Sequence, residues 1–199
     1  MKWLPPLTAL TALVLCIWLR AGTGGPVLVD LAAAAPDVKV DLRYATDDNF
    51  FRRRFYPEAR ALLRPSTAVK LAAAQKEFAA SGLSLKVWDA WRPLRVQREM
   101  WKVMPDPDYV ADPAKGSRHN RGAAVDVTLV NKDGRELEMP TGFDDFSPRA
   151  HADAANVSGS AKQNRALLRA VMERHGFRAL RTEWWHFDDA DWEQFGILE

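Results

Sequence analysis

The sequence predicts an α+β fold: a single domain with a mainly antiparallel central sheet and flanking helices. Three segments, 38–45, 85–90 and 123–130, have the apolar patterns of strands, whereas 66–80 and 161–174 have the periodicity of amphipathic helices. Helices and strands follow one another without regular β-α-β alternation, which favours an antiparallel sheet. A chain of 199 residues is long enough to bury one sizeable core.

Residues 1–23 are expected to be a signal peptide or an N-terminal membrane anchor, followed by one domain at 24–199. Lys2 precedes seventeen uncharged, mostly apolar residues, and Arg20 follows them. Seventeen residues is short for a helix that spans a membrane. The pattern predicts export, with the domain in the periplasm or anchored to the outer face of the inner membrane.

The first half of the domain begins with a half-buried strand and continues into a helix. The strand at 38–45 alternates apolar and charged residues. In the helix at 66–80, Ser66 is the expected N-cap, and Gly82 lies just beyond the C-terminal end.

The second half contains the strongest strand pattern. The strand at 85–90 is followed by Pro93, which suits the first turn of a helix. The strand AAVDVTLV at 123–130 is expected to turn into a partner at 135–139. A last strand is expected at 182–187, with the sequence TEWWHF.

Composition limits the chemistry. The only cysteine, Cys16, lies in the N-terminal segment, so a metal in the domain must be held by His, Asp or Glu. Without Lys2 and Arg20 the 28 basic residues become 26, equal to the 26 acidic ones, which argues against bulk nucleic-acid binding. The run FFRRRFY at 50–56 fits an anionic-polymer patch, but a solvated loop whose aromatic residues dock on the core is favoured.

The stretch SRHNRGAAVD, residues 117–126, places a histidine and an aspartate seven positions apart. In a helix, His119 and Asp126 would be separated by about 10.5 Å along the axis. Zinc ligands lie roughly 2.0–2.2 Å from the ion, so a helix cannot bring both to one metal. The chain must fold back, and Gly122 supplies the tight turn.

Asp126 lies in an apolar strand, where a buried carboxylate needs a partner. A salt bridge is as good an explanation as a metal unless a third ligand exists. His175 ends a helix, where a cationic side chain complements the helix dipole, and His151 lies in a polar loop. His186 is the favoured third ligand, because Glu183 precedes it and two tryptophans lie between them.

Glu183 and His186 would point to opposite faces of an ideal strand, because their spacing is odd. Both can serve one site if the strand ends or bulges there, or if Glu183 acts on a water molecule. Two histidines and an aspartate form an open catalytic zinc site, and a nearby glutamate is the usual general base for hydrolysis.

Arg92, in WDAWRP at 88–93, has two interpretations. It can donate to the oxyanion that forms when water attacks a carbonyl. It can equally be a structural arginine stacked between Trp88 and Trp91.

Together these motifs resemble a known family. SRHNRGAAVD resembles SxHxxGxAxD, and EWWH resembles ExxH, of the D-alanyl-D-alanine dipeptidase (VanX-like) family of zinc D,D-peptidases, whose fold is shared with hedgehog signalling domains. DLRYATDDNF, WDAWRP, GFDDF and KQNRALLRAVMERHGF are similar to further blocks of that family, so the resemblance covers about 37–189. The run at 52–54 departs from the family, which often has a glycine there.

The resemblance implies a role for each motif residue. One zinc ion per chain would be held by three ligands: His119, Asp126 and His186. The implied catalytic residues are Glu183, as general base and acid, and Arg92, as stabiliser of the tetrahedral intermediate. The implied substrate contacts are Ser117, Tyr44 and Asp144, the last near the substrate ammonium.

The expected function is zinc-dependent hydrolysis of D-Ala-D-Ala to free D-alanine in cell-wall peptide turnover or salvage. The alternative enzyme is a D,D-carboxypeptidase or endopeptidase acting on peptidoglycan stem peptides. A non-catalytic, zinc-stabilised domain that binds wall peptides is the third possibility. No glycine-rich phosphate loop is present, so no nucleotide cofactor is expected.

Overall fold

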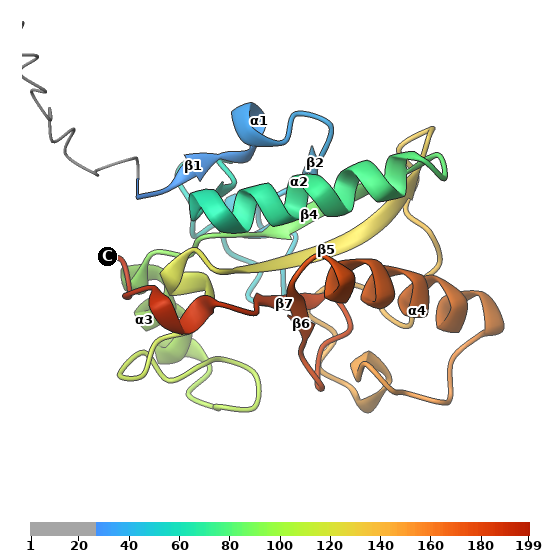
Figure 1. Ribbon diagram of the computed structural model, residues 1–199. Helices are drawn as coiled ribbons and strands as arrows, with labels where there is room; N and C mark the ends of the chain where they lie inside the picture. Colours follow the sequence, from blue (N-terminus) through green and yellow to red (C-terminus); the bar gives the residue numbers. More distant parts are fainter. Residues whose placement is uncertain (1–26) are drawn as a thin grey trace, which may run out of the picture.

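The computed structural model describes residues 27–199, which form a central sheet with helices packed against it (Figure 1). The sheet has five strands in the order β2-β4-β5-β7-β6. In chain order they are β2 (Lys39–Val40), β4 (Leu83–Asp89), β5 (Ala124–Asn131), β6 (Phe177–Ala179) and β7 (His186–Asp189). β2 is parallel to β4, and the other neighbours are antiparallel. The predicted α+β class is confirmed.

Two long helices, α2 (Pro65–Ala79) and α4 (Gly159–Arg174), lie side by side against the sheet (Figure 1). At the start of α4, the Ser158 hydroxyl accepts a hydrogen bond from the Ala161 amide at 3.0 Å, as an N-cap should. The smaller elements are α1 (Leu31–Ala34), α3 (Leu94–Val103) and a two-stranded sheet of β1 (Val29–Asp30) and β3 (Leu62–Leu63).

Successive side chains of β5 point to opposite faces of the sheet, so its apolar residues face the core and its polar residues face the other side. Val125, Val127 and Leu129 are fully buried and point to one face of the sheet. Asp126 and Thr128 point to the other face and are also buried. A strand that is buried on both sides therefore carries a carboxylate into the interior.

The strand predicted at 38–45 is much shorter than expected. Only Lys39–Val40 is strand, and Arg43–Ala45 forms a 3-10 turn. The turn is stabilised by pairing with a later loop, because the Tyr44 carbonyl accepts hydrogen bonds from the amides of Phe55 and Tyr56, both at 2.8 Å. These long-range bonds outweigh the local period-2 pattern.

Other predicted boundaries also need correction. The last strand, predicted at 182–187, begins at His186 and extends to Asp189, and the short strand β6 before it was not predicted. The expected partner at 135–139 forms an isolated bridge, in which Val130 pairs with Glu136. Ser66 does not cap α2: the helix begins one residue earlier at Pro65, whose fixed φ suits a first helical position.

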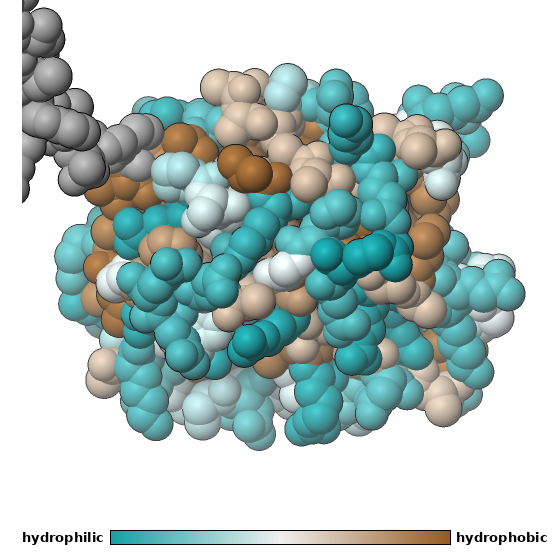
Figure 2. Space-filling view, in the orientation of Figure 1, coloured by the Kyte–Doolittle hydropathy of each residue, from teal (hydrophilic) through white to brown (hydrophobic). Residues whose placement is uncertain are grey.

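The predicted export segment, 1–23, lies outside the described residues. Within 27–199, no helix is both long and apolar enough to cross a bilayer. On the face shown in Figure 2, hydrophilic residues dominate and apolar residues reach the surface in small groups. In the arginine-rich loop, Phe51 and Phe55 pack on the core as expected, whereas Phe50 stays 45% exposed.

Candidate active site

One cavity of about 260 Å³ collects every residue that the sequence singled out for chemistry. They reach it from β5, the start of β7 and five connecting segments. The predicted residues that line the cavity are Tyr44, Arg92, Ser117, His119, Asp126, Asp144, Glu183 and His186.

His119 and Asp126 come together because the chain folds back between them. His119–Arg121 form a 3-10 turn, and Gly122 follows with φ +69° before β5 begins. A Cβ on Gly122 would lie 2.5 Å from the Leu28 side chain and 3.3 Å from the Arg64 backbone nitrogen. Positive φ and close packing therefore both require glycine at this turn.

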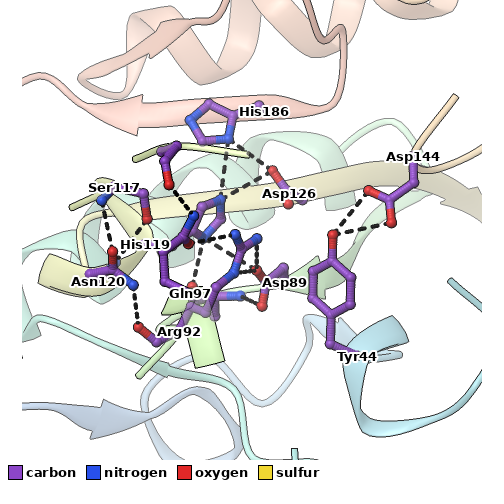
Figure 3. A network of polar contacts seen from close by, with 12 residues as sticks. Tyr44, Asp89, Arg92, Gln97, Ser117, His119, Asn120, Asp126, Asp144 and His186 are labelled. Atoms are coloured by element: carbon purple, nitrogen blue, oxygen red, sulfur yellow. Dashed lines mark hydrogen bonds and ion pairs between the residues drawn. The ribbon is translucent and has the colours of Figure 1, made fainter. Parts of the chain in front are cut away.

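Three ligand atoms form a compact triangle at the base of the cavity (Figure 3). His186 Nδ1 lies 3.0 Å from Asp126 Oδ1 and 3.2 Å from His119 Nε2. His119 Nε2 lies 3.4 Å from Asp126 Oδ1. Tetrahedral ligands at about 2.0–2.1 Å from zinc are separated by about 3.3 Å, so the spacing fits this ion.

The outward nitrogen of each histidine has its own partner. His119 Nδ1 donates to the Ala90 carbonyl at 2.6 Å, and His186 Nε2 donates to Asp188 Oδ1 at 2.8 Å. Both bonds leave the inward nitrogen with a free lone pair, as a metal ligand requires. Zinc-binding histidines are typically oriented by carbonyl or carboxylate acceptors of this kind, so the donor set fits zinc.

The pKa values of two ligand residues, Asp126 and His186, are shifted in opposite directions. Burial would raise the pKa of Asp126, but the charge of His119 and hydrogen bonds with both histidines hold it well below its usual range. Burial would lower the pKa of His186, but hydrogen bonds with Asp126 and Asp188 raise it well above its usual value. Both shifts have one cause: the buried carboxylates favour a positive charge beside them.

Glu183 lies in the turn before β7, so the odd spacing to His186 causes no conflict. Its Oε2 lies 3.9 Å from His186 Nδ1. Trp184 and Trp185 fix the turn, since each is 1% exposed. Burial, opposed by the charge of His186, raises the pKa of Glu183 to about 7, which suits a group that takes up and returns a proton near neutral pH.

Arg92 lines the same cavity with its guanidinium oriented by two side chains. Its Nε and one terminal nitrogen donate to Asp89 Oδ2 at 3.2 and 2.7 Å, and the other terminal nitrogen donates to Gln97 Oε1 at 2.9 Å. These bonds use three of the five N–H groups of an arginine. The guanidinium lies 5.1 Å from the centre of the Tyr44 ring, and the alternative interpretation, a stack between Trp88 and Trp91, is not found in the part of the chain that the structure describes.

Asp144 and Tyr44 form the acidic side of the cavity. The Tyr44 hydroxyl contacts both carboxylate oxygens of Asp144, at 3.0 and 3.1 Å. Burial, and then the negative charge of Asp126, raise the pKa of Asp144 to about 7. Asp144 has φ +57°, an uncommon conformation for a residue other than glycine. In Figure 3, Tyr44 and Asp144 lie on one side of the His119–Asp126–His186 group, and Ser117 lies on the other.

Ser117 is held at the cavity wall by Asn120. The Asn120 side chain accepts from the Ser117 amide at 2.7 Å, and the Ser117 hydroxyl accepts from the Asn120 amide at 3.2 Å. Asn120 also donates to the Arg92 carbonyl at 2.8 Å, which links this turn to the arginine.

Three supporting residues were missed from the sequence: Asp89, Gln97 and Asp188. Asp89 is completely buried, orients Arg92, and accepts a hydrogen bond from the Tyr56 hydroxyl at 2.7 Å. It had the same signal as Asp126, namely an acid in an apolar strand. Asp188 follows His186 by two residues on the same face of β7, but Gln97 had no distinguishing pattern.

The remaining histidines belong to the surface and the loops. His175 caps the end of α4, and its Nε2 pairs with Glu77 at 2.7 Å. His151 follows the 3-10 turn Pro148–Ala150, in the loop where the sequence placed it. Neither joins the ligand group found within residues 27–199.

Two histidines and an aspartate meet around one point of this α+β fold, and a partly buried glutamate and an arginine lie beside them. These features define a metal-dependent hydrolase of the zinc peptidase class. Comparison with known proteins agrees with this class. The family model described as D-ala-D-ala dipeptidase matches residues 26–194, and the chain belongs to that family. The expectation of a zinc metallopeptidase is confirmed at this level.

Similar proteins are found among bacterial enzymes and solved structures. The D-alanyl-D-alanine dipeptidase of Escherichia coli (strain K12) is 42% identical over 161 residues, which cover 81% of this chain and 83% of the relative. That of Enterococcus faecalis (strain ATCC 700802 / V583) is 32% identical, covering 75% and 85%. A solved structure of the vancomycin-resistance D,D-pentapeptidase VanY in complex with Zn(II) is 15% identical, with a TM-score of 0.42 over 79% of this chain and 81% of that one.

Proposed function

We propose that this protein hydrolyses the dipeptide D-Ala-D-Ala to two molecules of D-alanine. The observation that carries the proposal is the position of Glu183, a carboxyl group with 17% of its side chain exposed and a pKa of about 7, beside the His119–Asp126–His186 group. Relatives in the same family are named D-alanyl-D-alanine dipeptidases, which supports the choice of substrate.

His119, Asp126 and His186 would hold the zinc ion, through the inward nitrogens and a carboxylate oxygen. When bound, zinc supplies Lewis acidity, which polarises the scissile carbonyl and makes a water molecule acidic enough to lose its proton near pH 7. Glu183 accepts the proton of the attacking water and then returns it to the departing amine. The two N–H groups of Arg92 not bonded to Asp89 or Gln97 donate to the oxyanion.

The two ends of the dipeptide are distinguished by charge. Asp144, oriented by Tyr44, takes the free ammonium. Ser117 contacts the substrate on the other side of the metal group, where its hydroxyl is held by Asn120. A cavity of about 260 Å³ is at the small end of ligand sites, which suits a substrate of two alanines.

An assay of the full-length chain tests this function. Purified protein, with zinc or with a chelator, is offered D-Ala-D-Ala, L-Ala-L-Ala and a pentapeptide that ends in D-Ala-D-Ala, and free alanine is measured. Zinc-dependent release from the first substrate alone is expected. Equal cleavage of the pentapeptide would replace the proposal by the D,D-carboxypeptidase alternative, and cleavage of none would remove both.

We further propose that the enzyme acts outside the cytoplasm, on dipeptides released during cell-wall turnover. The support is the apolar segment between Lys2 and Arg20. Residues 1–26 fused to a reporter that is active only after export should give an active reporter. An inactive reporter with normal expression would contradict this location.

A further inference from the structure

Three aromatic side chains from three separate loops meet at the mouth of the cavity. The ring of Phe146 lies 5.1 Å from that of Phe50 and 4.8 Å from that of Tyr109, measured between centroids. Phe50 and Tyr109 are nevertheless 45% and 40% exposed, so the group is not part of the core. We call Phe50, Tyr109 and Phe146 the aromatic barrier.

The aromatic barrier stands between two hollows. Phe146 and Tyr109 line the catalytic cavity. Phe50 lines a second hollow of about 470 Å³, whose wall includes Arg43 and Arg52. Asp144, the residue assigned to the substrate ammonium, borders both hollows, and the contact of Phe50 with Phe146 joins a wall residue of one hollow to a wall residue of the other.

The aromatic barrier is linked by hydrogen bonds to residues of the catalytic cavity. The Phe50 amide donates to Asp144 Oδ2 at 3.3 Å. The loop that carries Tyr109 is held by Gln97, whose side chain donates to the Ala111 carbonyl at 2.7 Å. The same Gln97 accepts from the guanidinium of Arg92.

Dipeptides and longer peptides differ in the space that they need at this place. In a dipeptide the first nitrogen is an ammonium, and the chain ends at Asp144. In a longer peptide that nitrogen is an amide, and each further residue needs about 3.3–3.6 Å more room when extended. The second hollow, which Asp144 also borders, is where such room is available.

We propose that the aromatic barrier, with Phe146 at its centre, restricts the enzyme to dipeptides by closing the passage from the catalytic cavity to the second hollow. This inference rests on the proposed function. Removing the Phe146 ring joins the two hollows and admits the residues that precede D-Ala-D-Ala in a longer peptide.

The test compares kcat/KM for D-Ala-D-Ala with kcat/KM for a tripeptide that ends in D-Ala-D-Ala. Phe146→Ala is expected to raise the tripeptide-to-dipeptide ratio at least tenfold. Phe50→Ala and Tyr109→Ala should raise it in the same direction by less, because each removes one side of the group. Phe146→Tyr should keep the wild-type ratio. Leu167→Ala, on α4 and 40% exposed, is the control matched in exposure to Tyr109.

The outcomes separate this inference from the proposed function. If the wild type cleaves the dipeptide but Phe146→Ala leaves the ratio unchanged, the proposed function stands and the aromatic barrier is overturned. Wild-type cleavage of the tripeptide at the rate of the dipeptide would also overturn it. Circular dichroism and zinc content confirm that each variant is folded, and if Phe146→Ala does not fold, the exposed positions Phe50 and Tyr109 decide the result. Failure of the wild type on both substrates would remove both proposals.

Discussion

His186 donates a hydrogen bond from Nε2 to Asp188 at 2.8 Å, and this bond turns its Nδ1 toward the other two ligands, His119 and Asp126. His119 has the opposite arrangement, with Nδ1 bonded to the Ala90 carbonyl and Nε2 facing the metal group. The two ligands thus use different ring nitrogens, each selected by the partner of the other nitrogen.

Replacing Asp188 should weaken zinc binding. Asp188→Ala removes the acceptor that orients His186, so zinc affinity is expected to fall by about 10–100-fold. Asp188→Asn should be intermediate, because the amide oxygen still accepts but carries no charge. Competition with a chromophoric chelator measures the affinity, and Asp191→Ala, an exposed acid in the same segment, is the control. An affinity within threefold of wild type for Asp188→Ala would exclude the orienting role.

Replacing Glu183 should abolish turnover without releasing the metal. Glu183→Gln retains the size of the side chain but cannot accept a proton, so kcat is expected to fall by at least about 10²-fold. Metal analysis should still find one zinc per chain, because Glu183 is not one of the three ligands. Glu173→Gln, an exposed glutamate on α4, should behave as wild type. Substantial activity in Glu183→Gln would show that another group moves the proton.

Replacing Arg92 should affect the transition state more than substrate binding. Lysine cannot reproduce the paired bonds to Asp89 together with the bond to Gln97, so Arg92→Lys should lower kcat by about 10²-fold with a small change in KM. Arg92→Ala also leaves Asp89 buried without its cation, which should cost about 3–5 kcal/mol of unfolding free energy. Steady-state kinetics and urea unfolding separate the two effects. A rise in KM at constant kcat would assign Arg92 to substrate binding instead.

The raised pKa of Asp144 should make KM depend on pH. Because its pKa is raised to about 7, the carboxyl group is neutral below that pH and charged above it. The substrate ammonium, with a pKa of about 8, stays charged through this range and prefers the carboxylate. With zinc in excess, KM should therefore rise as the pH falls below 7, and Asp144→Asn should have a higher KM that no longer depends on pH. A wild-type KM that is constant from about pH 5.5 to 7.5 would contradict this assignment.

The sequence alone determined which donors are present and how the chain must turn near them. The absence of cysteine from the body restricted any metal site to His, Asp and Glu ligands, and the acid in an apolar strand and the glycine after His119 made such a site possible. His186, as a third candidate ligand, and the family resemblance completed the predicted set. The helices and the two central strands also followed from periodicity, because the period of a helix or a strand decides which residues share a face. Asp126 and Asp89 carried the same local signal, and only one was recognised.

The tertiary structure decided which distant groups meet and how each is oriented. Asp126 is paired with His186 by the register of β5 with β7, across 60 residues. Tyr44 reaches Asp144 across 100 residues, after a predicted strand gives way to a turn. No local pattern encodes these pairings, because hydrogen bonds and packing between separate elements select them. The ring nitrogens that face the metal and the aromatic barrier at the cavity mouth depend on the same long-range contacts.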